Sequence, residues 1–466
     1  MNRIGIMLFA MAVIGCAFGG RAVGHVIGAK SPKPQWMENA VIYEANLRQG
    51  TANRNIKGLQ EELPRLKDLG VDIIWLMPIH PISEKNRKGR LGSYYAVQDY
   101  KAVNPEFGTI DDLKEFVSRA HQLGMKVILD EVCNHTGCDN PWVTEHPEYY
   151  ARNEKGEMFG PFDWTDTYKL DYSKPATRKA MADVLKFWVK EADIDGYRCD
   201  VAGEVPTDFW EEVRPQLEAI KPVFMLAEAS EPSLMKKAFD ADYAWPMKDV
   251  FNAIAATQGV NKYAEQKKQN YPKTNAADIP ALIEKQTRQY PRGSVHMNMV
   301  TNHDLNSWEG TEFERFGPAV KTFAVLSYTL PGMPMLYTGQ EVGFNHAFEF
   351  FDHDKTQPNY TANEYTNFYK VLNTVKHHNT ALNANEPIER TNFIDSIDPD
   401  VLTFTRQNGK DKIVVIANLS DKVSTVHFLR REPYMVGMKN IFTGEDAKLP
   451  KILKPWEFVV FSTPIK

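Results

Sequence analysis

The sequence predicts an α/β protein, a (β/α)8 TIM barrel with a small insertion after the third strand and a C-terminal antiparallel β domain. Between residues 40 and 385, apolar strand-like runs alternate with helix-like runs, and eight strands can be counted. The connection at about residues 136–174 is too long for a simple loop. Beyond Asn385 the helical spacing stops, and short β-rich runs follow at 401–405, 413–418, 423–428 and 458–462.

The eight expected strands are short and mostly apolar. The run at residues 71–78 (VDIIWLMP) is the clearest, because a strand that is buried on both faces has no polar alternation. In chain order the strands are expected at residues 40–47, 71–78, 125–134, 194–201, 223–228, 243–245, 295–301 and 335–337.

Helices are expected between these strands. The first, Ile56–Leu69, has helical spacing and is followed by Gly70 as a stop. The second begins after Thr109, a favourable N-cap residue, with acidic residues in its first turn, and it ends at Gly124. Further helices are expected at residues 175–192, 206–220, 233–239, within 248–289, and at 319–330 and 364–377.

The length of 466 residues exceeds what one hydrophobic core usually supports, so at least two domains are expected. We expect a linker at residues 21–39, the barrel at 40–385 and the β domain at 386–466. The formal net charge of −5 provides no electrostatic reason to expect binding to nucleic acid.

Residues 1–20 have the features of a signal peptide. Arg3 precedes an apolar run at residues 4–14 that is too short to span a bilayer. The run ends in Val-Ile-Gly-Cys at residues 13–16, which resembles a bacterial lipobox, where the cysteine is acylated after cleavage. We therefore expect an exported lipoprotein of the bacterial cell envelope, in the outer membrane or periplasm, that is attached to the membrane through Cys16. An ordinary secretory signal is the alternative.

Three further cysteines follow Cys16. Export would allow a disulfide bond between Cys133 and Cys138, which flank the same loop. Cys199 is expected to be unpaired and packed in the core. The spacing of the three is a poor match to a zinc site.

Four polar strings stand at the carboxyl ends of expected strands. They are DEVCNH at residues 130–135, GYRCD at 196–200, Glu228 in FMLAEAS, and NHD at 302–304. Side chains at the carboxyl ends of barrel strands meet at one end of the barrel, so these residues are expected to lie together. Carboxylates with an arginine and histidines suit cleavage of a bond between sugars, which needs one ionised and one protonated carboxyl group.

Strand alternation predicts the directions of the side chains in GYRCD, at residues 196–200. Arg198 and Asp200 are expected to point together into the barrel, while Tyr197 and Cys199 face the helices. An adjacent arginine favours the ionised form of Asp200, and an ionised carboxylate can act as a nucleophile. A buried salt bridge without catalytic function is the alternative interpretation.

Glu228 follows an apolar run, so burial is expected to hold its carboxyl group protonated, as a general acid requires. The alternative is a glutamate exposed on a loop. Asp304, with His303 beside it, ends a third strand.

In this order the four strings closely resemble the four sequence regions of the α-amylase family of retaining glycoside hydrolases (family 13). The resemblance covers about residues 40–466 and is strongest to bacterial α-amylases of the cell envelope. Supporting strings are DWTDTYKLDYSKP at 163–175, DVAGEVPTDFW at 200–210 and YTGQE at 337–341. Gly203 and Glu204 stand where many α-amylases have a Lys-His pair.

The resemblance implies a role for each matching residue. Asp200 matches the nucleophile, Glu228 the general acid/base and Asp304 the stabiliser of the transition state. The residues that match the sugar-binding positions of the cleavage subsite are His135, Arg198 and His303, with Tyr95 as the aromatic platform.

The resemblance also implies a structural Ca2+ ion, because Asn134 and Asp171 match positions that bind calcium in many family members, and oxygen ligands suit this ion. The alternative is that Asn134 bonds to barrel backbone and Asp171 caps a turn. Glu204 replaces a histidine whose backbone helps to bind calcium elsewhere. No organic cofactor is expected.

The sequence therefore predicts an α-amylase-like hydrolase that cleaves α-1,4-glucosidic bonds in starch or maltooligosaccharides by double displacement. A cyclomaltodextrinase, neopullulanase or glucan transferase on the same scaffold is the enzymatic alternative. A non-catalytic sugar-binding protein is the alternative of another class, and the presence of all three carboxylates disfavours it.

Overall fold

The computed structural model describes residues 33–464. The expected signal peptide, Cys16 and most of the expected linker lie outside the described residues. Within the described part of the chain, no helix is both long enough and apolar enough to cross a membrane.

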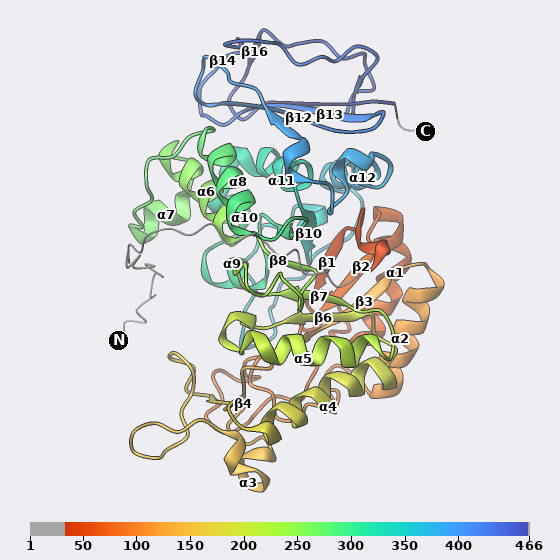
Figure 1. Ribbon diagram of the computed structural model, residues 1–466, viewed down its shortest axis with the longest axis vertical. Helices are drawn as coiled ribbons and strands as arrows, with labels where there is room; N and C mark the ends of the chain where they lie inside the picture. Colours follow the sequence, from red (N-terminus) through yellow and green to blue (C-terminus); the bar gives the residue numbers. More distant parts are fainter. Residues whose placement is uncertain (1–32, 465–466) are drawn as a thin grey trace, which may run out of the picture. The chain divides into compact units, whose positions relative to one another are not determined.

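In residues 33–464, eight parallel strands close into a barrel, which confirms the predicted fold class (Figure 1). The strands are β1 (Ile42–Ala45), β2 (Ile73–Leu76), β3 (Lys126–Glu131), β6 (Gly196–Cys199), β7 (Phe224–Ala227), β8 (Ala241–Tyr243), β9 (Val295–Asn298) and β10 (Met333–Tyr337). The barrel closes where Ile42 of β1 pairs with Met335 of β10. The strands are almost entirely buried, because side chains fill the interior and helices cover the outside.

The helices around the barrel mostly begin and end where local signals predict. Thr109 caps α2 in a capping box, in which its hydroxyl accepts from the Asp112 N–H and the Asp112 carboxylate accepts from the Thr109 N–H. Gly70 ends α1 in the left-handed region, at φ 98°.

The α-helices of the barrel domain outside its insertion are α1 (Ile56–Leu69), α2 (Ile110–Gln122), α4 (Pro175–Glu191), α5 (Thr207–Glu218), α6 (Trp245–Thr257), α7 (Lys262–Lys267), α8 (Asp278–Gln289), α9 (His303–Trp308), α10 (Glu312–Phe316), α11 (Val320–Thr329) and α12 (Glu364–His378). The 3-10 helices are η1 (Gln35–Met37), η2 (Pro147–Tyr149), η3 (Ala202–Glu204), η4 (Gly317–Ala319), η5 (Gln340–Val342), η6 (Thr380–Leu382) and η7 (Ile388–Arg390).

One predicted element after β7 is wrong, and the bounds of the next are shifted. Residues 233–239 form turns instead of a helix, because the connection between β7 and β8 is short. The strand expected at 243–245 is β8, which ends at Tyr243. It ends there because Asp242 and Tyr243 pair with β9, while α6 begins at Trp245 with a proline in its first turn.

Part of the expected linker is packed against the barrel. The 3-10 helix η1 buries Met37 and places the Trp36 ring 5.9 Å from the Phe224 ring.

The insertion is present after β3. It contains an antiparallel pair, β4 (His135–Gly137) and β5 (Thr167–Lys169), with the short helices α3 (Trp142–Glu145) and η2 between them. The disulfide bond considered between Cys133 and Cys138 is not formed. All cysteines within residues 33–464 are free and buried.

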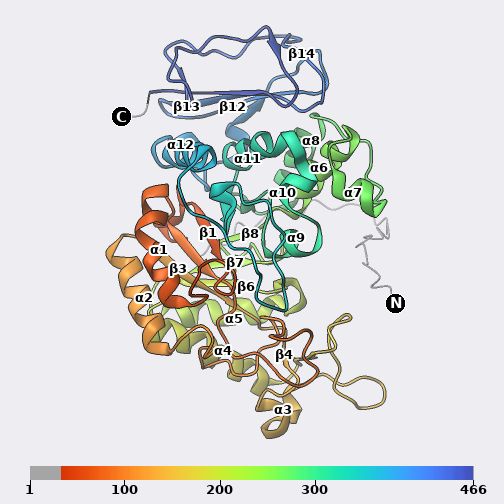
Figure 2. The same ribbon diagram turned by 180° about the vertical axis from the view of Figure 1, so that it is seen from behind.

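The C-terminal domain contains a five-stranded antiparallel sheet, in the order β11-β12-β13-β17-β15, and a two-stranded pair, β14-β16. Their bounds are β11 (Thr391–Phe393), β12 (Val401–Asn408), β13 (Asp411–Asn418), β14 (Ser424–Thr425), β15 (Lys439–Asn440), β16 (Ile452–Leu453) and β17 (Phe458–Ser462). In both views α11 and α12 lie between the barrel strands and this sheet (Figure 1 and Figure 2). The buried Arg406 of β12 donates to the Leu330 carbonyl after α11 at 3.1 Å, so the two domains share polar as well as apolar contacts.

Candidate active site

Carboxylates from three neighbouring strands meet at one buried arginine. Arg198 Nη1 donates to Asp130 Oδ1 and to Asp200 Oδ1, each at 2.8 Å. Its other terminal nitrogen, Nη2, lies 2.9 Å from Glu228 Oε2. Tyr197, on the opposite side of β6, donates from its hydroxyl to the Leu185 carbonyl of α4. Strand alternation predicts this division of side chains.

Local backbone features hold this cluster in place. Gly196 begins β6 at φ 145°, where a Cβ would lie 1.9 Å from the Phe224 carbonyl oxygen, so only glycine fits. Val201, directly after Asp200, has φ 36°, which is unusual for a β-branched residue. Its N–H donates to Glu228 Oε2 at 2.8 Å. The strained turn after β6 therefore helps to position the carboxyl group of the next strand.

Aromatic side chains surround the arginine and its partners. The Arg198 guanidinium lies 5.2 Å from the Trp75 ring and 5.6 Å from the Tyr95 and Tyr243 rings. Trp75 Nε1 and the Tyr95 hydroxyl both donate to Asp130 Oδ2, at 3.2 and 3.0 Å. Asp130 thus holds the same arginine nitrogen, Nη1, that contacts Asp200, and the cluster is rigid because each member is bonded or packed.

Burial raises the pKa values of Asp200 and Glu228, two of the three carboxyl groups at Arg198. Burial raises the pKa of Asp200 to about 6, against the opposing charge of Arg198. Burial raises the pKa of Glu228 to about 7, again against Arg198, and the nearby Asp200 and Asp304 raise it further. Glu228 therefore holds its proton to a higher pH than Asp200, which is the order that a general acid and a nucleophile require.

The histidine and aspartate after β9 begin helix α9. Asn302 caps that helix by accepting from the Leu305 N–H at 2.8 Å. His303 Nε2 lies 2.8 Å from the Tyr95 hydroxyl and 3.2 Å from Asp304 Oδ2. The Tyr95 ring stacks on the His303 ring at 5.3 Å and 22°. The site therefore has an aromatic face next to polar groups that can bind sugar hydroxyls.

His303 and Asp304 form a charged pair. Burial lowers the pKa of His303, but Asp304 and Glu44 raise it well above its usual value, so the ring is an imidazolium. Burial raises the pKa of Asp304, but His303 and Arg198 lower it overall, so this carboxylate is ionised. The Asp304 side chain is 39% exposed, which leaves it open to a ligand.

His135 differs from His303 in its charge. It lies at the start of β4, and its ring is 5.2 Å from the Trp164 ring of the insertion. Burial lowers the pKa of His135 to about 3 and the Lys169 ammonium lowers it as well, so this imidazole is neutral. It can therefore both donate and accept a hydrogen bond.

Two members of this cluster, Glu44 and Asp130, were not predicted from the sequence as functional residues. Glu44 is fully buried on β1, and its Oε1 lies 2.5 Å from His303 Nδ1. The available signal was a single carboxylate in the strand-like run at 40–47. Asp130 belongs to the polar string at 130–135, but the sequence pattern assigned it no role.

The described residues show no calcium site at the positions proposed for one, Asn134 and Asp171. Among residues 33–464, no group of three or more His, Cys, Asp or Glu side chains is placed to hold a metal ion. Asp171 Oδ1 accepts from the Ser173 N–H at 2.9 Å, and Oδ2 lies 3.8 Å from Lys174 Nζ. Glu204 pairs with Lys169 at 3.1 Å. Asp171 therefore caps a turn, and lysines meet the acidic groups that a Ca2+ ion would need.

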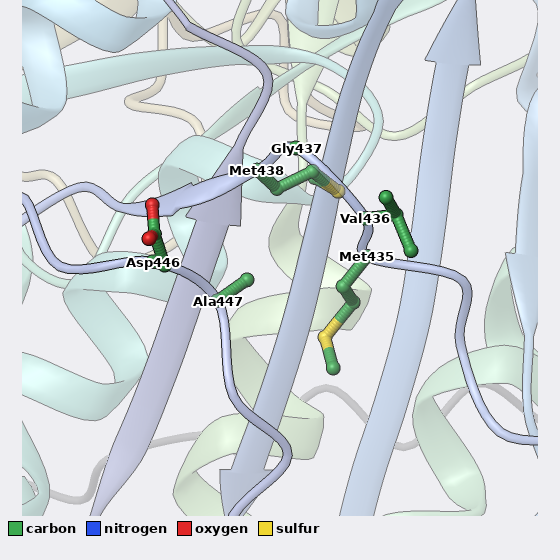
Figure 3. A pocket seen from close by; sticks show the side chains of 6 residues that line it. All are labelled: Met435, Val436, Gly437, Met438, Asp446 and Ala447. Carbon is green, nitrogen blue, oxygen red and sulfur yellow. The ribbon is translucent and has the colours of Figure 1, made fainter.

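A cavity of about 440 Å³ lies in the C-terminal domain, away from these residues in sequence and in fold. Figure 3 shows its mainly apolar lining, from Met435–Met438, Asp446 and Ala447. Within the described part of the chain, its lining includes one carboxyl group, Asp446, and no second acidic or basic side chain that could act with it as an acid/base pair. The cavity is therefore not part of the candidate active site.

Comparison with known proteins agrees with this geometry. The family model described as "Alpha amylase, catalytic domain" matches residues 42–169 and 150–387. Alpha-amylase 3 of Dictyoglomus thermophilum is 25% identical, over 92% of this chain and 94% of its own. A cyclomaltodextrinase of Thermoanaerobacter pseudethanolicus is 26% identical, and the match covers 80% of this chain but 64% of the relative. The crystal structure of the noncanonic maltogenic alpha-amylase AmyB from Thermotoga neapolitana superimposes with a TM-score of 0.76 at 28% identity, covering 91% of this chain and 98% of AmyB.

Proposed function

Because the chain belongs to the α-amylase family of glycoside hydrolases, we propose that it cleaves α-1,4-glucosidic bonds in starch-like glucans by double displacement, with retention of configuration. It is an α-glucan hydrolase, and the observation that carries the mechanism is the contact of one buried guanidinium with two carboxyl groups, Asp200 and Glu228.

In the first step Asp200 attacks the anomeric carbon, while Glu228 donates its proton to the oxygen of the departing sugar. A bond from the Asp200 carboxylate to carbon forms as the glycosidic carbon–oxygen bond breaks. In the second step Glu228, now a carboxylate, takes a proton from water as that water attacks the same carbon and frees Asp200. Retention by this route requires carboxyl groups about 5–5.5 Å apart, and the shared contact with Arg198 keeps them close.

The positive charge that develops on the sugar is stabilised by ionised Asp304. His303 and His135 bind sugar hydroxyls, the first as a charged donor and the second as a neutral donor and acceptor. Tyr95 supplies the aromatic face under the sugar ring. A structural calcium ion at Asn134 and Asp171 has no step in this mechanism.

Newly released sugar is expected to carry the α configuration, because two displacements at one carbon restore the starting stereochemistry. Proton NMR during the first turnovers on maltooligosaccharides measures the anomer before it mutarotates. A β product at early times would exclude Asp200 as the nucleophile.

A cyclomaltodextrinase is the second candidate, because one similar protein has that name. An assay for new reducing ends on starch, pullulan and cyclodextrin separates the two. Faster hydrolysis of starch than of cyclodextrin is expected for the first candidate, and the reverse order supports the second.

We also propose export and lipid attachment through Cys16, on the basis of Arg3, the apolar run at 4–14 and the lipobox-like string at 13–16. The protein is expected to fractionate with membranes, because an acyl chain adds apolar surface that inserts into lipid. Cys16→Ser should move it to the soluble fraction or leave it unprocessed. Wild-type protein found entirely in the soluble fraction would contradict the lipoprotein assignment.

A further inference from the structure

Large apolar side chains are exposed at only a few places in the part of the chain that the structure describes. Six of them lie between residues 397 and 452, in the C-terminal domain. The other two are Phe162, which is 54% exposed, and Trp308, which is 47% exposed. Single exposed apolar residues need no explanation by themselves. Trp308 differs because it is the last residue of α9, the helix that begins with His303 and Asp304.

Aromatic rings connect Trp308 to the cleavage subsite. The Trp308 ring lies 5.2 Å from the Phe350 ring and 5.8 Å from the Phe351 ring. Phe350 in turn stacks nearly parallel to Tyr95, at 6.5 Å and 13°. A continuous aromatic row therefore leads from the platform under the cleaved sugar to an exposed indole.

The loop that carries Phe350 and Phe351 is bonded firmly to α9. Asn306 donates from its side chain to the His346 carbonyl at 2.9 Å and accepts from the Phe348 N–H at 2.8 Å. On the other side, Arg48 Nη1 donates to the Phe350 carbonyl at 3.1 Å, and the Leu91 N–H donates to the Phe351 carbonyl at 2.9 Å. Because these elements are held before any ligand arrives, binding on the row costs little ordering entropy.

The row lies on one particular side of the scissile bond. Glu228 protonates the leaving oxygen, and the loop after Asp200 reaches the insertion through the contact of Glu204 with Lys169. Trp308 belongs instead to the elements that carry Asp304 and pack against Tyr95. Because the row starts beside Tyr95 and Asp304 and not at Glu228 or the loop after Asp200, we assign it to the side of the sugar that becomes attached to Asp200.

We propose that Trp308, supported by Phe350 and Phe351, is the stacking platform for a second glucose unit, next to the unit that is cleaved and on its non-reducing side. The inference rests on the proposed function and names a residue that determines where the enzyme cuts. A pyranose ring has an apolar face of C–H groups, and a flat, exposed aromatic ring offers a matching surface. Such binding favours enzyme–substrate complexes in which two or more glucose units lie on the non-reducing side of the scissile bond.

The test is the bond-cleavage pattern on maltohexaose labelled at its reducing end. Wild-type enzyme is expected to release little glucose from the non-reducing end. Trp308→Ala should increase that first-bond cleavage relative to the other bonds, and lower kcat/KM for maltohexaose by about tenfold because an aromatic contact with the substrate is lost. Trp308→Phe should keep most of the wild-type pattern.

Trp308→Leu keeps apolar bulk on Phe350 without a flat face, so it should act like Trp308→Ala even if the alanine variant folds poorly. Tyr434→Ala is the matched control, because Tyr434 is 68% exposed in the C-terminal domain. Unchanged cleavage frequencies in both Trp308→Ala and Trp308→Leu would overturn the platform and leave the proposed function standing. Wild-type protein that cleaves no α-glucan would overturn the proposed function, and the platform with it.

Discussion

Asp200→Ala is expected to lower the kcat for starch by about 10⁴-fold or more, because only binding and electrostatic stabilisation remain when the nucleophile is removed. The shorter side chain also leaves room for a small anion beside Arg198. With an activated α-glucosyl fluoride and added azide, the variant should form a β-glucosyl azide, since azide would attack from the face that Asp200 occupied. The azide product and its anomer are measured by NMR.

Asp183→Asn is a suitable control, because Asp183 pairs with Lys179 and Lys186 on α4 and contacts no member of the cluster. Its activity should equal that of wild type. If Asp200→Ala hydrolyses starch at a tenth of the wild-type rate, another group is the nucleophile. If azide yields the α anomer, the attacking face has been assigned wrongly.

Arg198→Leu is expected to lower kcat strongly and to move the acidic limb of the kcat/KM profile to higher pH. The guanidinium holds the pKa of Asp200 down to about 6 against burial. Without it that pKa rises, so the ionised nucleophile is lost at a higher pH as the solution is acidified. The position of the limb is the diagnostic quantity, because part of the kcat loss comes from lost sugar contacts.

The structure changes one part of this expectation. If only the Arg198–Asp200 pair is considered, the arginine separates the pKa values of Asp200 and Glu228. Arg198 also contacts Glu228 and lowers its pKa as well. The basic limb should therefore move to higher pH together with the acidic limb, and the whole profile should shift.

Arg198→Leu should also destabilise the fold, because breaking a buried ion pair costs about 3–5 kcal/mol. Thermal unfolding measures this loss, and Arg198→Lys, which keeps a positive charge, should leave the acidic limb nearer to wild type. A folded and active Arg198→Leu variant with an unmoved acidic limb would show that Arg198 does not set the pKa of Asp200.

Local patterns were sufficient for most of the barrel. The helix predicted at Ile56–Leu69 agrees with α1 to the residue, because Asn55 caps its start and Gly70 ends it. Both are contacts within a few residues, so sequence alone can reveal them. The helix predicted at 233–239 failed because its length depends on where β7 and β8 pair, and that pairing involves distant residues.

The sequence by itself determined about where the parallel strands end, and hence that Asp200, Glu228 and Asp304, which follow three of them, gather at one end of the barrel. The tertiary structure alone decided which side chains touch there. Glu44 and His303 are 259 residues apart, and Arg198 reaches carboxyl groups on both neighbouring strands. The period of a strand tells which side a residue faces, but the contacts across a barrel depend on strand register and closure, which no single strand encodes.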